Sequence, residues 1–81
     1  MVIPLSHVPV GEHAVVVHIA CGGDMEARLH DLGFLPGSQI SCVLRKKKKG
    51  MGAFLVRNAV IALRHSTCNE ILVEYEEPCR L

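Results

Sequence analysis

The sequence predicts a mainly β fold: a small barrel of about five short strands, with one short α-helix inserted between the first and second long strands. The apolar side chains are largely Val, Ile, Leu and Ala, with two Phe, one Tyr and no Trp, which favours a strand-rich core. They alternate with other residues along short segments, and one segment has helical spacing instead. Short, twisted strands of this kind bury their common face by curling into a barrel.

The chain of 81 residues predicts a single domain, residues 1–81, with little room for both a core and an enclosed active site. No apolar run approaches the roughly 18–20 residues of a membrane helix, and Met1 to Leu5 do not resemble a signal peptide. We therefore expect a cytoplasmic protein without direct membrane insertion. The net charge of +1 and the few aromatic residues argue against a nucleic-acid partner.

The first segment is predicted to be irregular, because Pro4, Pro9 and Gly11 interrupt it. Leu5 and Val8 within it have the character of core residues.

Residues 14–20 predict the first long strand, which ends at Gly22-Gly23. Its alternation divides the side chains between two faces, with Val15, Val17 and Ile19 on one and Val16 and His18 on the other.

Residues 24–33 predict the helix. Asp24 is placed to cap its N-terminus, and Met25, Leu29 and Leu32 recur at the spacing of one helical stripe. Two interpretations of these three residues follow: they face the core, or they border a shallow apolar cleft between helix and barrel that accepts a partner's side chain. Both interpretations stay open at this point.

The end of the helix carries several agreeing signals. Gly33 suits the left-handed position that terminates a helix, and Phe34 then lies where it can touch Leu29. Pro36 prevents continuation, and with Gly37 it predicts a tight turn.

Three further strands and their connections complete the barrel. Their alternation places Ile40, Cys42 and Leu44 on one face of the second strand and Ile71, Val73 and Tyr75 on one face of the last. The predicted elements are a strand at 39–45, a polar hairpin tip at 46–52, a strand at 53–57, a turn at Arg57-Asn58, a strand at 59–63, a turn or single helical turn at 64–69 and a strand at 70–76.

Catalysis is not expected. Cys68 lies near His65, but no third group is evident to orient such a pair, and no glycine-rich phosphate loop is present. We expect no resident cofactor and assign no metal ligand, because the histidines and cysteines lack the clustered spacing of a zinc site. A transition metal ion held weakly by two or three of them is the alternative. The candidates are His7, His13, His18, His30, His65, Cys21, Cys42, Cys68 and Cys79.

The segment from Arg28 to Gly37, RLHDLGFLPG, resembles the R-L-x-x-L-G-h-x-P-G signature of the FeoA family, where h is apolar. These are small cytoplasmic accessory proteins of bacterial ferrous iron transport, and a similar signature occurs in the C-terminal domain of repressors related to diphtheria toxin repressor. Weaker matches follow in the opening segment, in the strand pair VRN…IALR and in the last strand, so that the resemblance extends from about residue 4 to residue 76.

The resemblance implies an SH3-like barrel with a helix after the first long strand. It also implies a non-enzymatic role in ferrous iron uptake and a partner, the cytoplasmic G-protein portion of the membrane transporter FeoB. The alternative is a metal-responsive or metal-binding SH3-like module related to the repressor domain. The oligomeric state stays open, a homo-oligomer included.

The predicted docking surface combines the helix, the turn that follows it and the lysine hairpin. The run from Arg45 to Lys49 suits an acidic partner surface or anionic headgroups, or else simply solvates a hairpin tip. The residues assigned to partner binding are Met25, Arg28, Leu29, Leu32, Phe34, Lys46 and Lys47.

Overall fold

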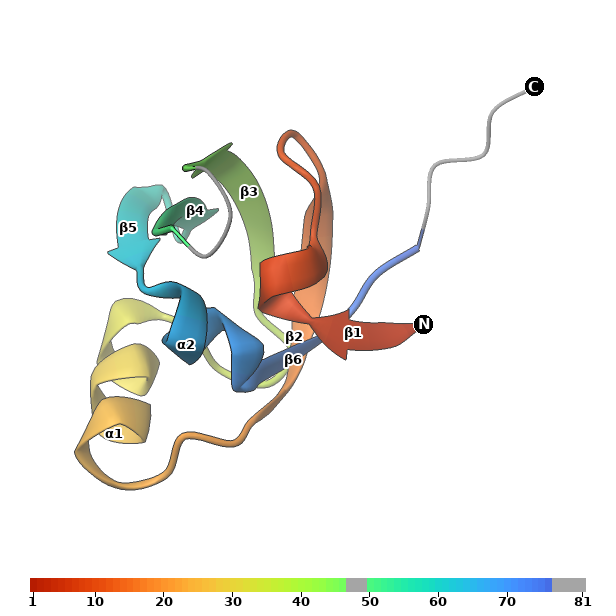
Figure 1. Cartoon of the computed structure of the whole chain (residues 1–81). Coiled ribbons are helices and arrows are strands. Elements are labelled where there is room, and N and C mark those ends of the chain that lie inside the picture. The colour runs from red at the N-terminus through yellow and green to blue at the C-terminus, as the bar shows by residue number, and fades with distance from the viewer. Residues whose placement is uncertain (47–49, 77–81) are drawn as a thin grey trace.

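The computed structural model describes residues 1–46 and 50–76 and is mainly β. Six strands form one sheet in the order β1-β6-β2-β3-β4-β5, and every neighbouring pair is antiparallel (Figure 1). In chain order the elements are β1 (Val2–Pro4), the 3-10 helix η1 (Leu5–His7), β2 (His13–Ile19), α1 (Gly23–Leu32), β3 (Gln39–Arg45), β4 (Gly52–Val56), β5 (Ala59–Leu63), α2 (His65–Asn69) and β6 (Ile71–Glu74).

The sheet curls into an SH3-like barrel that hydrogen bonds do not close. β1 and β5 are its two ends, and within the described residues no ladder joins them. The helical turns that follow these strands, η1 and α2, lie side by side, with a hydrogen bond from the Ser6 hydroxyl to the Asn69 side-chain oxygen. The predicted barrel is therefore confirmed with one difference: it has an open seam, because the chain coils into helical turns there.

The sequence analysis predicted an irregular opening segment and therefore missed the short strand β1. Val2 to Pro4 pair with Glu74 to Leu72 of β6. Three residues are too few to show alternation, and Pro4 obscures them further. Proline is nevertheless compatible with this place because β1 is an edge strand, whose outward position needs no N–H donor.

The core lies inside the curled sheet and is sealed by the two helical turns. Leu5 and Val8 are fully buried, as expected, and Phe34 and Phe54 are the largest of the fully buried side chains. The buried apolar residues are Leu5, Val8, Ala14, Val16, Ile19, Leu29, Phe34, Ile40, Cys42, Phe54, Val56, Leu63, Cys68, Ile71, Val73 and Tyr75.

Two β-bulges correct the predicted faces. The register of β2 against β6 shifts between Val16 and His18, so Ile19 turns into the core while Val15 and Val17 stay exposed. A bulge inserts one residue and reverses the alternation beyond it.

The second bulge lies in β3, where the register against β4 shifts between Cys42 and Leu44. Leu44 was expected to share a face with Ile40 and Cys42, but it is 54% exposed while both of them are buried.

The helix α1 ends in a Schellman motif. Gly33 has a φ of 106° in the left-handed region, and the N–H of Phe34 donates to the carbonyl of Leu29 at 2.8 Å. The N–H of Gly33 donates to His30. The predicted end of the helix is thus confirmed, whereas its predicted start is wrong: the N-cap is Gly22, and Asp24 lies in the first turn without a capping hydrogen bond.

Two tight turns follow the sequence signals. The Ser38 N–H donates to the Leu35 carbonyl across Pro36 and Gly37, whose φ is 94°, as in a type II turn. Arg57 and Asn58 both have positive φ, which defines a two-residue hairpin turn between β4 and β5.

Among the described helices, none is long and apolar enough to cross a membrane.

Candidate functional site: a cleft between α1 and β5

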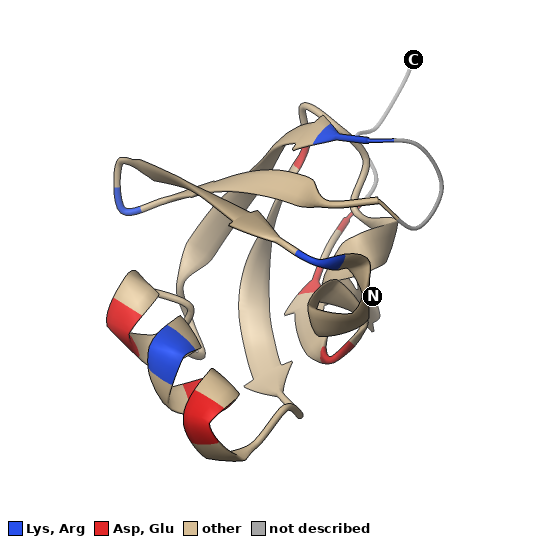
Figure 2. Ribbon diagram, turned by 60° about the vertical axis from the view of Figure 1, so that its left-hand side comes forward, with Lys and Arg blue, Asp and Glu red and all other residues tan. Residues whose placement is uncertain are grey.

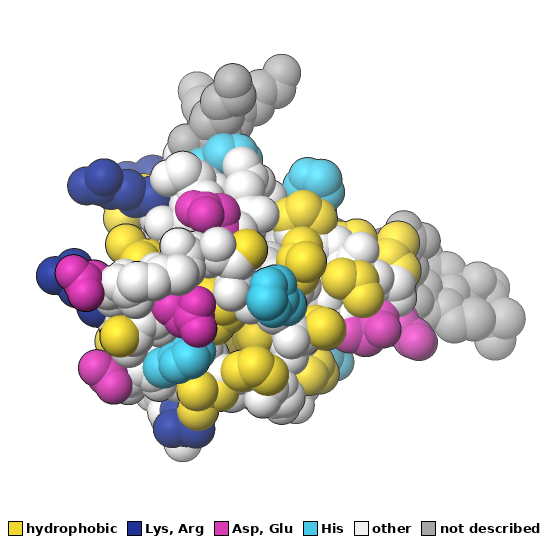
Figure 3. Space-filling model, turned by 90° about the horizontal axis from the view of Figure 1, so that it is seen from below, with side chains coloured by type: hydrophobic (Ala, Val, Ile, Leu, Met, Phe, Trp, Pro, Cys, Tyr) yellow, Lys and Arg dark blue, Asp and Glu magenta, His cyan; other side chains and the backbone are white. Residues whose placement is uncertain are grey.

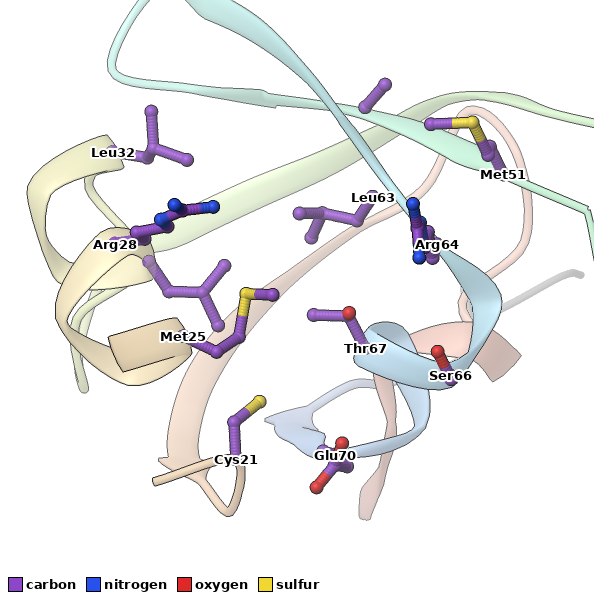
Figure 4. A pocket seen from close by; sticks show the side chains of 12 residues that line it. Cys21, Met25, Arg28, Leu32, Met51, Leu63, Arg64, Ser66, Thr67 and Glu70 are labelled. Carbon is purple, nitrogen blue, oxygen red and sulfur yellow. The ribbon is translucent and has the colours of Figure 1, made fainter. Parts of the chain in front are cut away.

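A cleft of about 650 Å³ lies between α1 and the wall formed by β5 and α2 (Figure 4). Its volume falls within the roughly 300–1,000 Å³ of ordinary ligand sites. The lining residues are Cys21, Met25, Arg28, Leu29, Leu32, Met51, Ala62, Leu63, Arg64, Ser66, Thr67 and Glu70.

The helix forms one wall and leaves its apolar side chains accessible. Leu29 is the one residue of α1 that is buried, whereas Met25 and Leu32 are 41% and 44% exposed. A helix of ten residues anchored by a single buried side chain stands away from the sheet. Of the two interpretations of the stripe, the structure therefore supports a cleft, with Leu29 at its floor and Met25 and Leu32 along its side.

The opposite wall comes from the end of β5 and from α2. Leu63 is buried and faces the helix across the cleft, and Thr67 of α2 lies below it (Figure 4). Met51, which precedes β4, borders the far side and is 47% exposed. The walls thus combine apolar and polar side chains, with a methionine on each side, and methionine adapts readily to irregular partner surfaces.

Two arginines give the cleft its charge. Arg28 reaches from α1 across the opening, and Arg64 stands at the end of β5 (Figure 4). Two ion pairs are present among the described residues, and neither involves either arginine. Both guanidinium groups are exposed and available to an acidic ligand.

Cys21 and Glu70 lie together at the lower end of the cleft (Figure 4). Burial, and secondly the negative charge of Glu70, raise the pKa of the Cys21 thiol. The thiol therefore stays protonated at neutral pH and behaves as part of the apolar lining.

The remaining residues assigned to partner binding lie outside this cleft. Phe34 is completely buried, because the helix cap folds it back onto Leu29, so it supports the wall from within and presents no surface. Lys46 is exposed and does not line the cleft. Its backbone N–H donates to the carbonyl of Met51, which does line it. Lys47 lies outside the described residues.

The sequence analysis did not assign the second wall. Met51, Leu63, Arg64 and Thr67 come from segments with no recognisable motif, and only the packing of β5 and α2 opposite α1 brings them to the cleft. A weak signal existed at Met51, where a large apolar residue stands between two glycines in a polar hairpin.

No group of three metal-ligating side chains occurs within residues 1–46 and 50–76. Cys21, Cys42 and Cys68 are free thiols there, and Cys79 lies outside the described residues. Burial raises the pKa of the Cys68 thiol to about 11. This thiol packs as a small apolar group, and it is too poor a thiolate to act as a nucleophile at neutral pH.

The charged residues lie mainly on helices and turns, and the strands are almost free of them (Figure 2). On the face seen from below in Figure 3, apolar side chains gather from the centre toward the side away from α1, with a histidine among them, while Lys and Arg gather toward the side that carries α1.

Fold and cleft together define a small, single-sheet SH3-like module that presents a groove lined by apolar and polar side chains, with two arginines among them. The sequence model of the FeoA domain matches residues 3–75, and the chain belongs to the FeoA family. A comparison with the sequences of curated proteins found no match.

Solved structures share the fold. The FeoA protein of Chlorobium tepidum superposes with a TM-score of 0.86 at 19% identity, over 96% of this chain and 74% of that one. Stenotrophomonas maltophilia FeoA, solved with zinc and described as a procaryotic SH3 domain protein, gives a TM-score of 0.74 at 26% identity, over 91% and 89%. A manganese-dependent transcriptional repressor gives 0.82 at 18% identity over 93% of this chain, which spans 42% of the repressor.

Proposed function

We propose that this protein is a cytoplasmic, non-enzymatic accessory protein of bacterial ferrous iron uptake. Its membership of the FeoA family supports the role, and the Stenotrophomonas maltophilia relative is described as a candidate activating factor of ferrous iron transport. In this proposal it docks on the cytoplasmic G-protein portion of a FeoB-like membrane transporter and thereby supports or regulates transport.

The cleft between α1 and β5 is the proposed docking surface. The observation that carries it is the exposure of Met25 and Leu32, which line the cleft although their helical spacing is that of core residues. Covering an exposed apolar side chain contributes roughly 1.5–3 kcal/mol when burial is complete. Apolar side chains held open at a groove are therefore suited to a partner's apolar side chain.

Replacement of Met25 with Asp tests the docking surface. We expect it to weaken binding to the purified cytoplasmic portion of the transporter by at least about tenfold, because a carboxylate in a desolvated contact costs more than about 1.4 kcal/mol. The measurement is titration calorimetry, with circular dichroism to show that the fold persists.

Val10→Asp is the matched control. Val10 is 54% exposed in the turn before β2, on the other side of the molecule from α1 (Figure 1). Equal affinities of the two variants would remove the cleft from the proposal.

The alternative function is that of a metal-responsive or metal-binding module. The fold that this chain shares with the manganese-dependent repressor supports this alternative. Equilibrium dialysis with ferrous, manganous and zinc ions separates the two. Stoichiometric, tight binding of one ion would favour the alternative, whereas transporter docking requires none.

A further inference from the structure

We propose that the free edge of β5 binds an extended, acidic segment of a partner protein as an added strand, within the cleft beside α1. This inference rests on the proposed function, since it specifies how the docking surface holds its partner. It concerns the backbone of β5, which the docking proposal leaves unused.

β5 is an unprotected edge. It is the last strand of the sheet, and among the described residues only β4 pairs with it. Its sequence, Ala59 to Leu63, contains no charge and no proline, and Figure 2 shows no charged residue along it before the start of α2. Natural proteins usually blunt such edges with charges, prolines or bulges, so an unblunted apolar edge suits strand addition.

The hairpin geometry identifies the groups that the edge offers. The two-residue turn at Arg57-Asn58 makes Val56 and Ala59 a hydrogen-bonded pair, and bonded pairs then alternate along the ladder. Ala59, Ile61 and Leu63 therefore direct their N–H and C=O groups toward β4. Val60 and Ala62 direct theirs outward, to the free edge.

The edge opens on the cleft. Ala62 and Leu63 line it together with Met25 and Leu32 of α1. In Figure 1, β4 lies to the right of β5, and α1 lies below it. A strand added to β5 thus bonds to Val60 and Ala62 while one row of its side chains meets the apolar wall of the helix.

The charge of the cleft selects the chemistry of the added segment. Arg28 and Arg64 flank the edge without an acidic partner, and Arg57 precedes β5 at the hairpin turn. The one acidic lining residue, Glu70, lies at the lower end beside Cys21 (Figure 4). An occupant with alternating apolar and acidic residues satisfies both the wall and the arginines, whereas a basic one meets like charge.

The direct test uses synthetic peptides of about eight residues, a common strand length, in which valine alternates either with glutamate or with lysine. The glutamate peptide is expected to bind, to shift the amide resonances of Val60 and Ala62, and to slow their hydrogen exchange. The lysine peptide is expected to bind at least about tenfold more weakly. Binding of both alike, or of neither, overturns the proposal, as does self-association through β5 without peptide.

Ala62→Pro removes one outward N–H and no bond to β4, and an edge strand tolerates proline at such a position. Affinity for the glutamate peptide is expected to fall at least about tenfold, while Ala62→Val, which keeps the N–H, binds normally. Equal affinity of the two variants would show that side chains alone hold the ligand. Should Ala62→Pro fail to fold, methylation of alternate peptide nitrogens makes the same test from the other side.

The same variants distinguish this inference from the proposed function. Loss of transporter binding in Met25→Asp but not in Ala62→Pro leaves docking intact and refutes strand addition. Binding of the glutamate peptide by a protein that does not bind the transporter leaves strand addition intact and refutes the proposed partner.

Discussion

The Schellman motif at Gly33 makes a specific demand that Gly33→Ala tests. Its φ of 106° is a conformation that side chains rarely adopt, and a Cβ built there would lie 3.0 Å from Cδ of Arg57. The substitution therefore adds both backbone strain and a tight contact. The helix and the hairpin turn meet at this point, so the effect reaches the cleft as well as the fold.

The magnitude follows from those two terms. The left-handed conformation costs a residue with a Cβ about 1–2 kcal/mol. Displacing the flexible Arg57 side chain from its rotamer adds about 0.5–1.5 kcal/mol. A total near 2 kcal/mol lowers the melting temperature of a domain of this size by about 8–16 °C.

Gly11→Ala provides the matched control. Gly11 also has a positive φ, 89°, but a Cβ there meets nothing within 4 Å, so only the strain applies. Thermal and urea unfolding of both variants, together with Gly33→Ala/Arg57→Ala, separate strain from contact. Equal losses at Gly33 and Gly11 would refute the contact, and a loss below about 0.5 kcal/mol at Gly33, the range of neutral surface substitutions, would refute the cap itself.

The remaining predictions concern one partly buried set of hydrogen bonds and one buried thiol. Arg45 donates to the carbonyls of Val8 at 2.8 Å and Leu5 at 3.4 Å, so Arg45→Met should lower the free energy of unfolding in urea by about 1.5–3 kcal/mol. Lys46→Met, at an exposed neighbour, should stay within about 0.5 kcal/mol, and equal effects would refute the role of those bonds. Burial raises the pKa of Cys68 from 9.0 to about 11, so the unfolded chain loses this proton first as pH rises. Stability should fall between those two pH values, by at most about 1.4 kcal/mol per pH unit, and Cys68→Ala should lack this component; an identical alkaline decline in Cys68→Ala contradicts the assignment.

Local signals in the sequence predicted local structure well. The end of α1 and the turn at Pro36-Gly37 were predicted, because glycine and proline act on the few dihedral angles beside them. β3 and β5 have the predicted bounds. The start of α1 was not predicted correctly, since Gly22 caps the helix by backbone conformation alone.

Features that depend on how strands pair were not predicted from the sequence. The bulges at Val16/His18 and Cys42/Leu44 each insert one residue into a strand, and the alternation of apolar residues in this sequence does not show where such an insertion falls. β1 has the same origin, since its three residues become a strand only by pairing with β6.

The candidate site likewise has one part that the sequence predicted and one part that it did not. The helical stripe of Met25, Leu29 and Leu32 was visible in the sequence, but its exposure was not, because exposure depends on how far the helix stands from the sheet. The wall contributed by β5 and α2 was not predicted, because only tertiary packing brings these elements opposite α1.

The stability of α1 and the shape of the cleft depend on the same few contacts. Because Leu29 is the only buried residue of the helix, packing alone does little to fix the direction in which α1 runs. The bonds from Gly33 and Phe34 to the last turn, with Phe34 anchored in the core, supply the missing constraint. Gly33→Ala should therefore weaken ligand binding in the cleft beyond what Gly11→Ala does at equal folded fraction, and identical affinities would separate the geometry of the cleft from the cap.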